Sequence, residues 1–140
     1  MSGFSQLDDD EKELVEKIKN ERIQAQKEYD ALPKYGDIIE INHLTYKDAV
    51  QIKNHVLVHI SSDHLPECKR VNYILRQLAD KFPTLKICKI DYKEANKDFP
   101  ERNCPTLLIY SCGQVIKQFV GTFEIGGRNV TADDLEWKLF

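Results

Sequence analysis

The middle of this chain alternates apolar runs with a strongly amphipathic stretch, and this alternation limits the fold more than any other feature. Residues 55–60 (HVLVHI) form a continuous apolar run of the kind that is buried on both faces of a sheet. Residues 85–91 form another predicted strand. Between them, residues 67–82 place apolar side chains on one helical face, at Val71, Ile74, Leu75, Leu78 and Phe82. A helix between two such strands predicts a parallel pair joined by a crossover, and therefore an α/β fold.

The flanking segments extend this order in both directions. We predict further strands at residues 37–41, 106–110 and 115–120, and helical segments at residues 44–53, 93–99 and from 132 onward. Asn42 and Thr131 are the expected helix caps, and residues 111–114, which contain Gly113, join the last two strands as a hairpin. The predicted order, βαβαβαββα, describes a mixed sheet flanked by helices, which is the order of the thioredoxin-like fold.

A charged segment without Gly or Pro precedes this domain. Residues 8–31 are rich in helix formers, and Asp8-Asp9-Asp10-Glu11 places negative charge where it favours the helix dipole. Its apolar stripe is thin, with Val15, Ile18, Ala25 and Tyr29. The helix could lie on its own domain, but so few apolar residues favour an arm that grips a partner. We therefore divide the chain into a helical arm, residues 1–34, and a thioredoxin-like domain, residues 35–140.

Composition and spacing exclude several classes of function. The net charge of −3 argues against a general nucleic-acid binder, and no apolar run approaches the length of a membrane helix. The four cysteines and four histidines show no C-x-x-C and no zinc spacing, and no Gly-rich phosphate loop is present, so we expect no metal and no cofactor. Isolated cysteines without a signal peptide indicate a cytoplasmic protein. The chain stops at Leu139-Phe140 without a capping signal, which suggests a fragment of a longer protein.

The segment that leads into the main helix occupies the redox corner of the predicted fold. Residues 103–110 (NCPTLLIY), followed by Gly113 and Gly121, resemble the second half of a thioredoxin, in which the matching proline is cis and faces the redox site. Pro105 is therefore predicted to be cis. Aligned by Cys68-Lys69, Cys68 takes the resolving position and Leu65 takes the attacking one. Since leucine cannot attack a disulfide, we predict no dithiol catalysis.

Neighbouring positions support the same interpretation. His59 stands where thioredoxins hold a buried acid, and His64 stands where they hold a tryptophan. Glu67, beside Cys68, is expected to disfavour a thiolate by like-charge repulsion. The vestigial redox corner thus consists of Leu65, Cys68, Cys104 and Pro105.

A weaker thiol function remains open. Cys104 precedes the predicted cis-proline, so the fold should bring it near Cys68, where a reversible bond or a modification could form. The favoured alternative is that both are small core residues, because free cysteines are among the most buried residue types. Cys88, on a strand, is expected in the core, and Cys112, on the hairpin turn, is expected to be exposed.

Four stretches together resemble the phosducin-like proteins, in the branch also called viral inhibitor-of-apoptosis-associated factor. They are residues 65–69 (LPECK), 80–83 (DKFP), 100–110 (PERNCPTLLIY) and 126–131 (GGRNVT). The resemblance runs from about Tyr35 to Phe140 and implies a thioredoxin-like domain used for binding. Phosducin itself binds G-protein βγ subunits, while this branch is associated with the cytosolic chaperonin that folds actin and tubulin. Cys104 departs from the leucine that the family implies there.

These observations predict a function without catalysis. We expect a phosducin-like adaptor or co-chaperone that modulates chaperonin-assisted folding of actin and tubulin, with the chaperonin and its clients as partners. The alternatives are a single-cysteine thiol redox protein that uses Cys68 and Cys104, and a regulator of G-protein βγ subunits. Neither a nucleic acid nor a membrane is an expected partner.

Overall fold

The structure is a computed structural model that describes residues 8–139. Residues 1–7, which the sequence analysis assigned to the arm, and Phe140 lie outside the described residues. The chain divides into two compact units, residues 1–33 and residues 34–140.

The first unit holds one helix, α1 (Asp9–Ala31). Asp8 is its N-cap, and the Asp8 carboxylate accepts a hydrogen bond of 2.7 Å from the backbone N–H of Glu11. Acidic residues occupy the first turn, as the sequence predicts, and their negative charges stabilise the helix by interacting with the positive end of its dipole. Leu14 and Ile23 are 58% and 53% exposed, so this helix presents apolar side chains on its surface.

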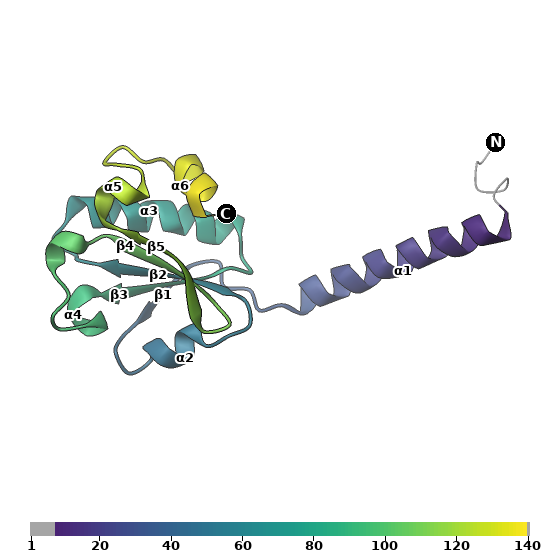
Figure 1. Ribbon diagram of the computed structural model, residues 1–140, viewed down its shortest axis with the longest axis horizontal. Helices are drawn as coiled ribbons and strands as arrows, with labels where there is room; N and C mark the ends of the chain where they lie inside the picture. The colour runs from purple at the N-terminus through teal and green to yellow at the C-terminus, as the bar shows by residue number, and fades with distance from the viewer. Residues whose placement is uncertain (1–7, 140) are drawn as a thin grey trace. The chain divides into compact units, whose positions relative to one another are not determined.

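The second unit is built on a five-stranded mixed sheet (Figure 1). Its strands are β1 (Ile38–Ile41), β2 (His55–Ser61), β3 (Lys86–Asp91), β4 (Thr106–Ser111) and β5 (Gln114–Val120). They lie in the order β1-β3-β2-β4-β5. Strands β1, β2 and β3 run parallel to one another, whereas β4 runs antiparallel to both of its neighbours, β2 and β5. In the central strand β2, Val58 pairs with Cys88 of β3 on one side and with Leu108 of β4 on the other. The predicted α/β architecture is therefore confirmed.

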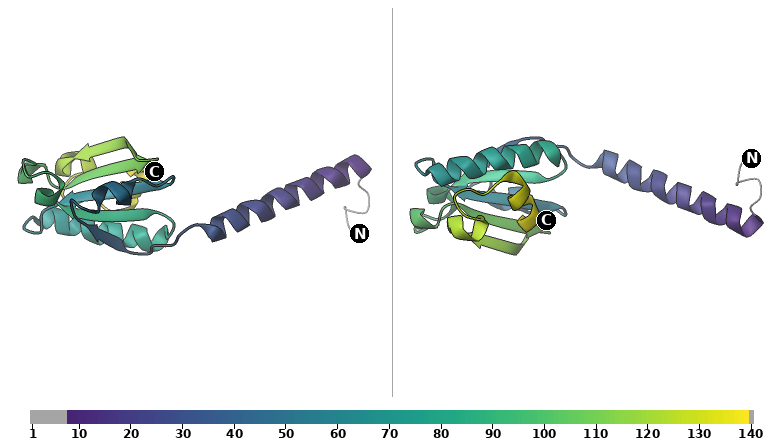
Figure 2. Two further views of the ribbon diagram at one scale, coloured as in Figure 1. Left: turned by 90° about the horizontal axis from the view of Figure 1, so that it is seen from below. Right: turned by 90° about the horizontal axis from the view of Figure 1, so that it is seen from above.

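Helices cover both faces of this sheet. Helix α3 (Pro66–Lys81) lies on one face together with α5 (Gly121–Ile125) and α6 (Ala132–Leu139). Helices α2 (Tyr46–Val50) and α4 (Tyr92–Ala95) pack against the other face. The views from below and above in Figure 2 show α2 in front of the sheet in one and α6 in the other. Because side chains alternate along a strand, each face receives its own core.

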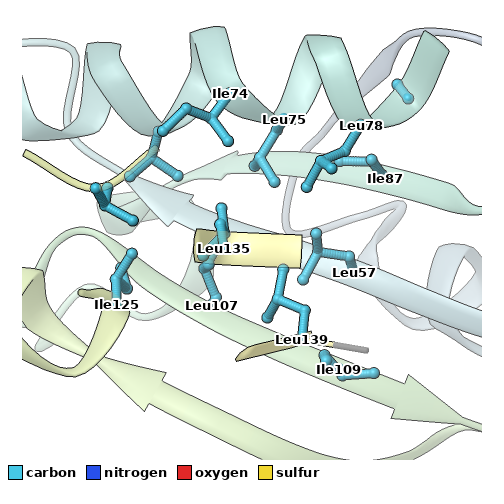
Figure 3. Close-up of a cluster of buried hydrophobic side chains, with 13 residues drawn as sticks. Leu57, Ile74, Leu75, Leu78, Ile87, Leu107, Ile109, Ile125, Leu135 and Leu139 are labelled. Atoms are coloured by element: carbon cyan, nitrogen blue, oxygen red, sulfur yellow. The ribbon is translucent and has the colours of Figure 1, made fainter. Parts of the chain in front are cut away.

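The larger core lies between the sheet and α3 (Figure 3). Leu57 and Leu107 from the sheet meet Leu75 and Leu78 from α3, and all four are at most 1% exposed. The second core lies on the opposite face and extends to the start of α3, so that it includes both Cys68 and Cys104. The predicted helical face of residues 67–82 is thus the element that fills the larger core.

The short elements differ from their predictions. Helix α2 begins at Tyr46 and has five residues, instead of spanning residues 44–53. Asn42 does not cap it, because the Asn42 side chain accepts from the backbone N–H groups of Leu44 and Thr45 and so forms a turn before the helix. Helix α4 has four residues and begins at Tyr92 rather than Lys93, with Asp91 as its cap.

Two features surround the last strand. Cys112 and Gly113 have φ angles of 51° and 79°, which gives β4 and β5 the two-residue turn that matches strand twist, and Cys112 is exposed as predicted. Helix α5 was not predicted, because a five-residue helix between Gly121 and Gly126 carries no periodic signal. The predicted cap of the last helix is present, since Thr131 Oγ1 accepts from the backbone N–H of Asp134 at 3.2 Å.

Candidate functional site

The candidate site lies where α3 begins. Leu65 is the N-cap residue of this helix, with extended backbone angles and no side-chain capping bond, and Pro66 occupies the first turn. Cys68 follows in the same turn and is 1% exposed. Leu65, which the sequence analysis aligns with the attacking cysteine of a thioredoxin, is half-buried, and the first turn of α3 carries one thiol.

A second segment brings another thiol to the same place. Cys104 lies directly before β4, is 4% exposed, and is joined to Pro105 by a cis peptide bond, the isomer that the resemblance implies. Cys68 and Cys104 lie in the same buried cluster, each shifts the pKa of the other, and both cysteines are free. Of the four residues that the sequence analysis grouped together, the structure therefore brings the two cysteines into one buried cluster.

Three groups shift the pKa of Cys68 downward. The largest contribution is the hydrogen bond from Cys104, and the side chain of His59 and the backbone N–H of Ser62, at 3.4 Å from Sγ, add to it. Burial acts in the opposite direction. The pKa of Cys104 is raised, chiefly by its hydrogen bond to Cys68 and by burial, so Cys68 is the thiol of this pair that ionises first.

The expected like-charge effect of Glu67 on Cys68 stays a prediction. The pKa of Cys68 is lowered overall, because hydrogen bonds to the sulfur outweigh burial. The Glu67 carboxylate lies 3.9 Å from Nε of Arg128, which offsets part of its negative charge.

His59 adds a polar group to this apolar setting. It lies on β2, is fully buried, and its Nδ1 is 2.7 Å from Oδ1 of Asn72 on α3. Since an amide oxygen can only accept, Nδ1 carries the ring proton and Nε2 keeps a lone pair. Within residues 8–139, the buried Nε2 has no hydrogen-bond partner, and the side chain of His59 favours the thiolate of Cys68.

Sequence reasoning missed three residues of this site. Ser62 donates its backbone N–H to Cys68 and its hydroxyl to Glu101, at 2.7 Å. Glu101 belongs to the short 3-10 turn Glu101–Asn103, and its carbonyl accepts from the N–H of Cys104 at 2.9 Å. The Ser62–Glu101 bond thus ties together the two segments that carry the thiols. For Asn72 a signal existed, because it lies four residues after Cys68 and so on the same side of the helix.

Other kinds of site find no support in the described part of the chain. Across residues 8–139, no group of three His, Cys, Asp or Glu side chains is arranged to hold a metal ion. In the same residues, every helix is too short or too polar to cross a membrane. The site is therefore a buried pair of thiols with an adjacent imidazole, which we call the thiol cluster (Cys68, Cys104 and His59).

Solved structures of known proteins resemble this chain in fold. A point mutant of thioredoxin from Halobacterium salinarum superposes with a TM-score of 0.59 at 18% identity, over 76% of this chain and 95% of that one. Thioredoxin f from spinach chloroplast superposes with a TM-score of 0.55 at 22% identity, over 61% of this chain and 76% of that one. These likenesses confirm the thioredoxin-like fold and concern the fold alone.

Sequence relatives carry a more specific likeness. Phosducin-like protein 2 from Dictyostelium discoideum is 36% identical over 128 residues, which are 90% of this chain and 54% of that protein. Phosducin-like protein 3 from Mus musculus is 31% identical over 137 residues, which are 96% of this chain and 57% of that protein. The chain therefore spans little more than half the length of these relatives. The phosducin family model matches residues 2–139, and this chain belongs to the phosducin family.

Proposed function

We propose that this chain is the thioredoxin-like part of a non-catalytic adaptor, a cytoplasmic co-chaperone that modulates the folding of actin and tubulin by the cytosolic chaperonin. Membership of the phosducin family supports a regulator that binds other proteins. The observation that carries the absence of catalysis is Leu65, which occupies the N-cap of α3 where thiol chemistry needs a cysteine. A fold can be reused for binding after its chemistry is lost.

Exposed aromatic side chains indicate where a partner binds. Phe123 on α5 and Trp137 on α6 are 92% and 87% exposed, and Tyr73 on α3 is 63% exposed. All three helices lie on the same face of the sheet (Figure 2). Large aromatic residues dominate the binding energy of protein interfaces, and leaving them in water without a partner is unfavourable. We place the contact with the partner on this helical face.

The first test is binding to the chaperonin. Purified full-length protein, mixed with purified cytosolic chaperonin, is expected to co-elute with it in gel filtration. Replacing Phe123 and Trp137 together with alanine should weaken this binding about tenfold or more, since such residues are the usual hot spots. The matched control is Leu44→Ala, which removes a side chain that is 77% exposed and lies next to α2 on the other face.

Two results would contradict the proposal. Full-length protein that fails to associate with the chaperonin would overturn the choice of partner. Retention of G-protein βγ subunits from a defined mixture, with no chaperonin bound, would favour a phosducin-type regulator instead.

The second test is catalysis itself. The chain is expected to reduce the disulfides of insulin no faster than dithiothreitol alone, because Leu65 cannot form the mixed disulfide. The readout is the turbidity of precipitating insulin chains, with a thioredoxin as positive control. Turnover that is abolished by Cys68→Ser and retained by Cys112→Ser would show an enzyme and refute this part of the proposal.

A further inference from the structure

We propose that Cys68 and Cys104 are a redox-sensitive pair, which hydrogen peroxide converts into an intramolecular disulfide and a small dithiol converts back. This inference goes beyond the binding role proposed above and does not depend on it. It concerns a stoichiometric switch within one chain, and therefore does not need the attacking cysteine whose place Leu65 occupies.

The placement of the two thiols is the first argument. Cys68 and Cys104 are 1% and 4% exposed in the same buried cluster, and the backbone N–H of Ser62 donates to the Cys68 sulfur at 3.4 Å. The segments that carry them are joined by the 2.7 Å hydrogen bond between Ser62 and Glu101. Cys104 is also held by its N–H bond to the carbonyl of Glu101. Two loops tied in this way keep the thiols together without a covalent bond.

His59 is the second, independent argument. Burying an imidazole is unfavourable unless both ring nitrogens form hydrogen bonds. His59 is fully buried, and its Nε2 has no hydrogen-bond partner within residues 8–139. Asn72 fixes the proton on Nδ1, so Nε2 keeps a lone pair, and the side chain of His59 favours the thiolate of Cys68. An imidazole that faces a thiol and is oriented by an amide is the arrangement that activates a cysteine nucleophile.

The surrounding charges assign different roles to the two thiols. On one side of Cys68 lie His59 and the hydrogen-bonding Cys104, and both favour its thiolate. Around Cys104, the Cys68 sulfur and the carboxylates of Glu101 and Asp91 all disfavour ionisation. Cys68 is therefore the thiol that reacts with the oxidant, and Cys104 is the one that resolves the product.

The reaction proceeds in two balanced steps. His59 takes the proton of Cys68, whose thiolate attacks one oxygen of hydrogen peroxide; an S–O bond forms, the O–O bond breaks, and the departing hydroxide takes the proton from His59 to give water. Cys104 then attacks the sulfenic sulfur of Cys68; an S–S bond forms, the S–O bond breaks, and the hydroxide leaves as water with the proton of Cys104. Overall, the two thiols lose two electrons, and peroxide is reduced to two waters.

Mass spectrometry of the whole chain tests this proposal. We would use the Cys112→Ser variant, because Cys112 is exposed and would react separately. Treatment with equimolar hydrogen peroxide at pH 7 is expected to remove two hydrogens from the intact mass, and dithiothreitol should restore them. Trypsin cleaves after Lys53, Lys69, Arg102 and Lys117, so the expected product is peptide 54–69 linked to peptide 103–117.

Matched variants separate the roles of the residues. Cys104→Ser should leave Cys68 as a sulfenic acid that dimedone traps, whereas Cys88→Ser, which changes another buried cysteine, should leave the disulfide intact. His59→Gln should slow oxidation at pH 7 by up to about tenfold, because one group that favours the Cys68 thiolate is lost while Cys104 remains. The rate should then reach its plateau at a higher pH than in the parent chain. A fall in rate without this change in the pH profile would refute the role of His59.

Two outcomes would overturn the proposal as a whole. One is a folded chain in which both Cys68 and Cys104 still react with a maleimide after unfolding, despite peroxide treatment. The other is a disulfide that links Cys68 to Cys88 instead. Neither readout involves a chaperonin. A chain that forms no Cys68–Cys104 disulfide could therefore still bind the chaperonin, and a chain that binds no chaperonin could still form the disulfide.

Discussion

Replacing Leu75 with alanine is expected to lower the free energy of unfolding by about 2–5 kcal/mol. Leu75 is fully buried in the middle of α3 and faces Leu57 and Leu107 of the sheet (Figure 3). Its truncation removes apolar contacts and leaves a cavity that α3 cannot fill, because the helix also packs against α6. Urea unfolding followed by circular dichroism measures the loss. The chain's single tryptophan, Trp137, is 87% exposed and would report it poorly.

Tyr73→Ala is the matched control for this change. Tyr73 lies two residues earlier on the same helix but is 63% exposed, so its truncation should change the free energy of unfolding by no more than about 0.5 kcal/mol. If Leu75→Ala and Tyr73→Ala had equal effects, the described packing of α3 against the sheet would be incorrect.

The oxidised chain is expected to unfold at higher urea than the reduced chain, with a difference of about 4 kcal/mol in the free energy of unfolding. A bond between Cys68 and Cys104 would close a loop of about 37 residues, and this closure reduces the entropy of the unfolded chain. The loop contains most of α3 and all of β3 and α4, so both faces of the sheet would be affected. The measurement is urea unfolding of Cys112→Ser protein with and without peroxide treatment.

Cys104→Ser in the same background provides the control. Without the second thiol no loop closes, and peroxide treatment should leave the free energy of unfolding within about 0.5 kcal/mol of the untreated value. An oxidised chain no more stable than the reduced one, although its disulfide is present, would mean that the bond strains the folded state as much as it restricts the unfolded one.

The proposed function and the proposed switch use different parts of the second unit. The binding surface is placed on the exposed aromatic residues of α5 and α6, whereas the thiol cluster is buried at the start of α3. Cys104 connects to Pro105 and β4, which packs beside α5, so the two sites share a segment of backbone. Measuring chaperonin binding before and after oxidation would show whether they are coupled.

Long periodic elements were predictable from the sequence, and short ones were not. The predicted α3 and the observed helix differ by one residue at each end, because apolar spacing over four turns leaves little ambiguity. Helices α2, α4 and α5 have five residues or fewer, so their limits depend on turns such as that of Asn42 rather than on periodicity. Their ends are decided by neighbouring segments of the folded chain.

In the candidate site, the residues were predictable from the sequence, but the contacts between them were not. Leu65, Cys68, Cys104 and Pro105 could be singled out because the order of strands and helices, together with the family resemblance, placed them at one corner. The bonds of Ser62 to Glu101 and of His59 to Asn72 join residues far apart in the chain or on different elements. No periodicity predicts such contacts, and the lowered pKa of Cys68 depends on them.

The amino-acid sequence by itself determined the α/β class, the order of strands and helices along the chain, and the presence of a leucine at position 65, because these follow from residue type and spacing. Only the tertiary structure decided that Cys68 and Cys104 share a buried cluster, that Asn72 orients His59, and which thiol ionises first. The physical reason is that a pKa and a hydrogen bond depend on the distances between groups and on their burial, and folding alone sets both.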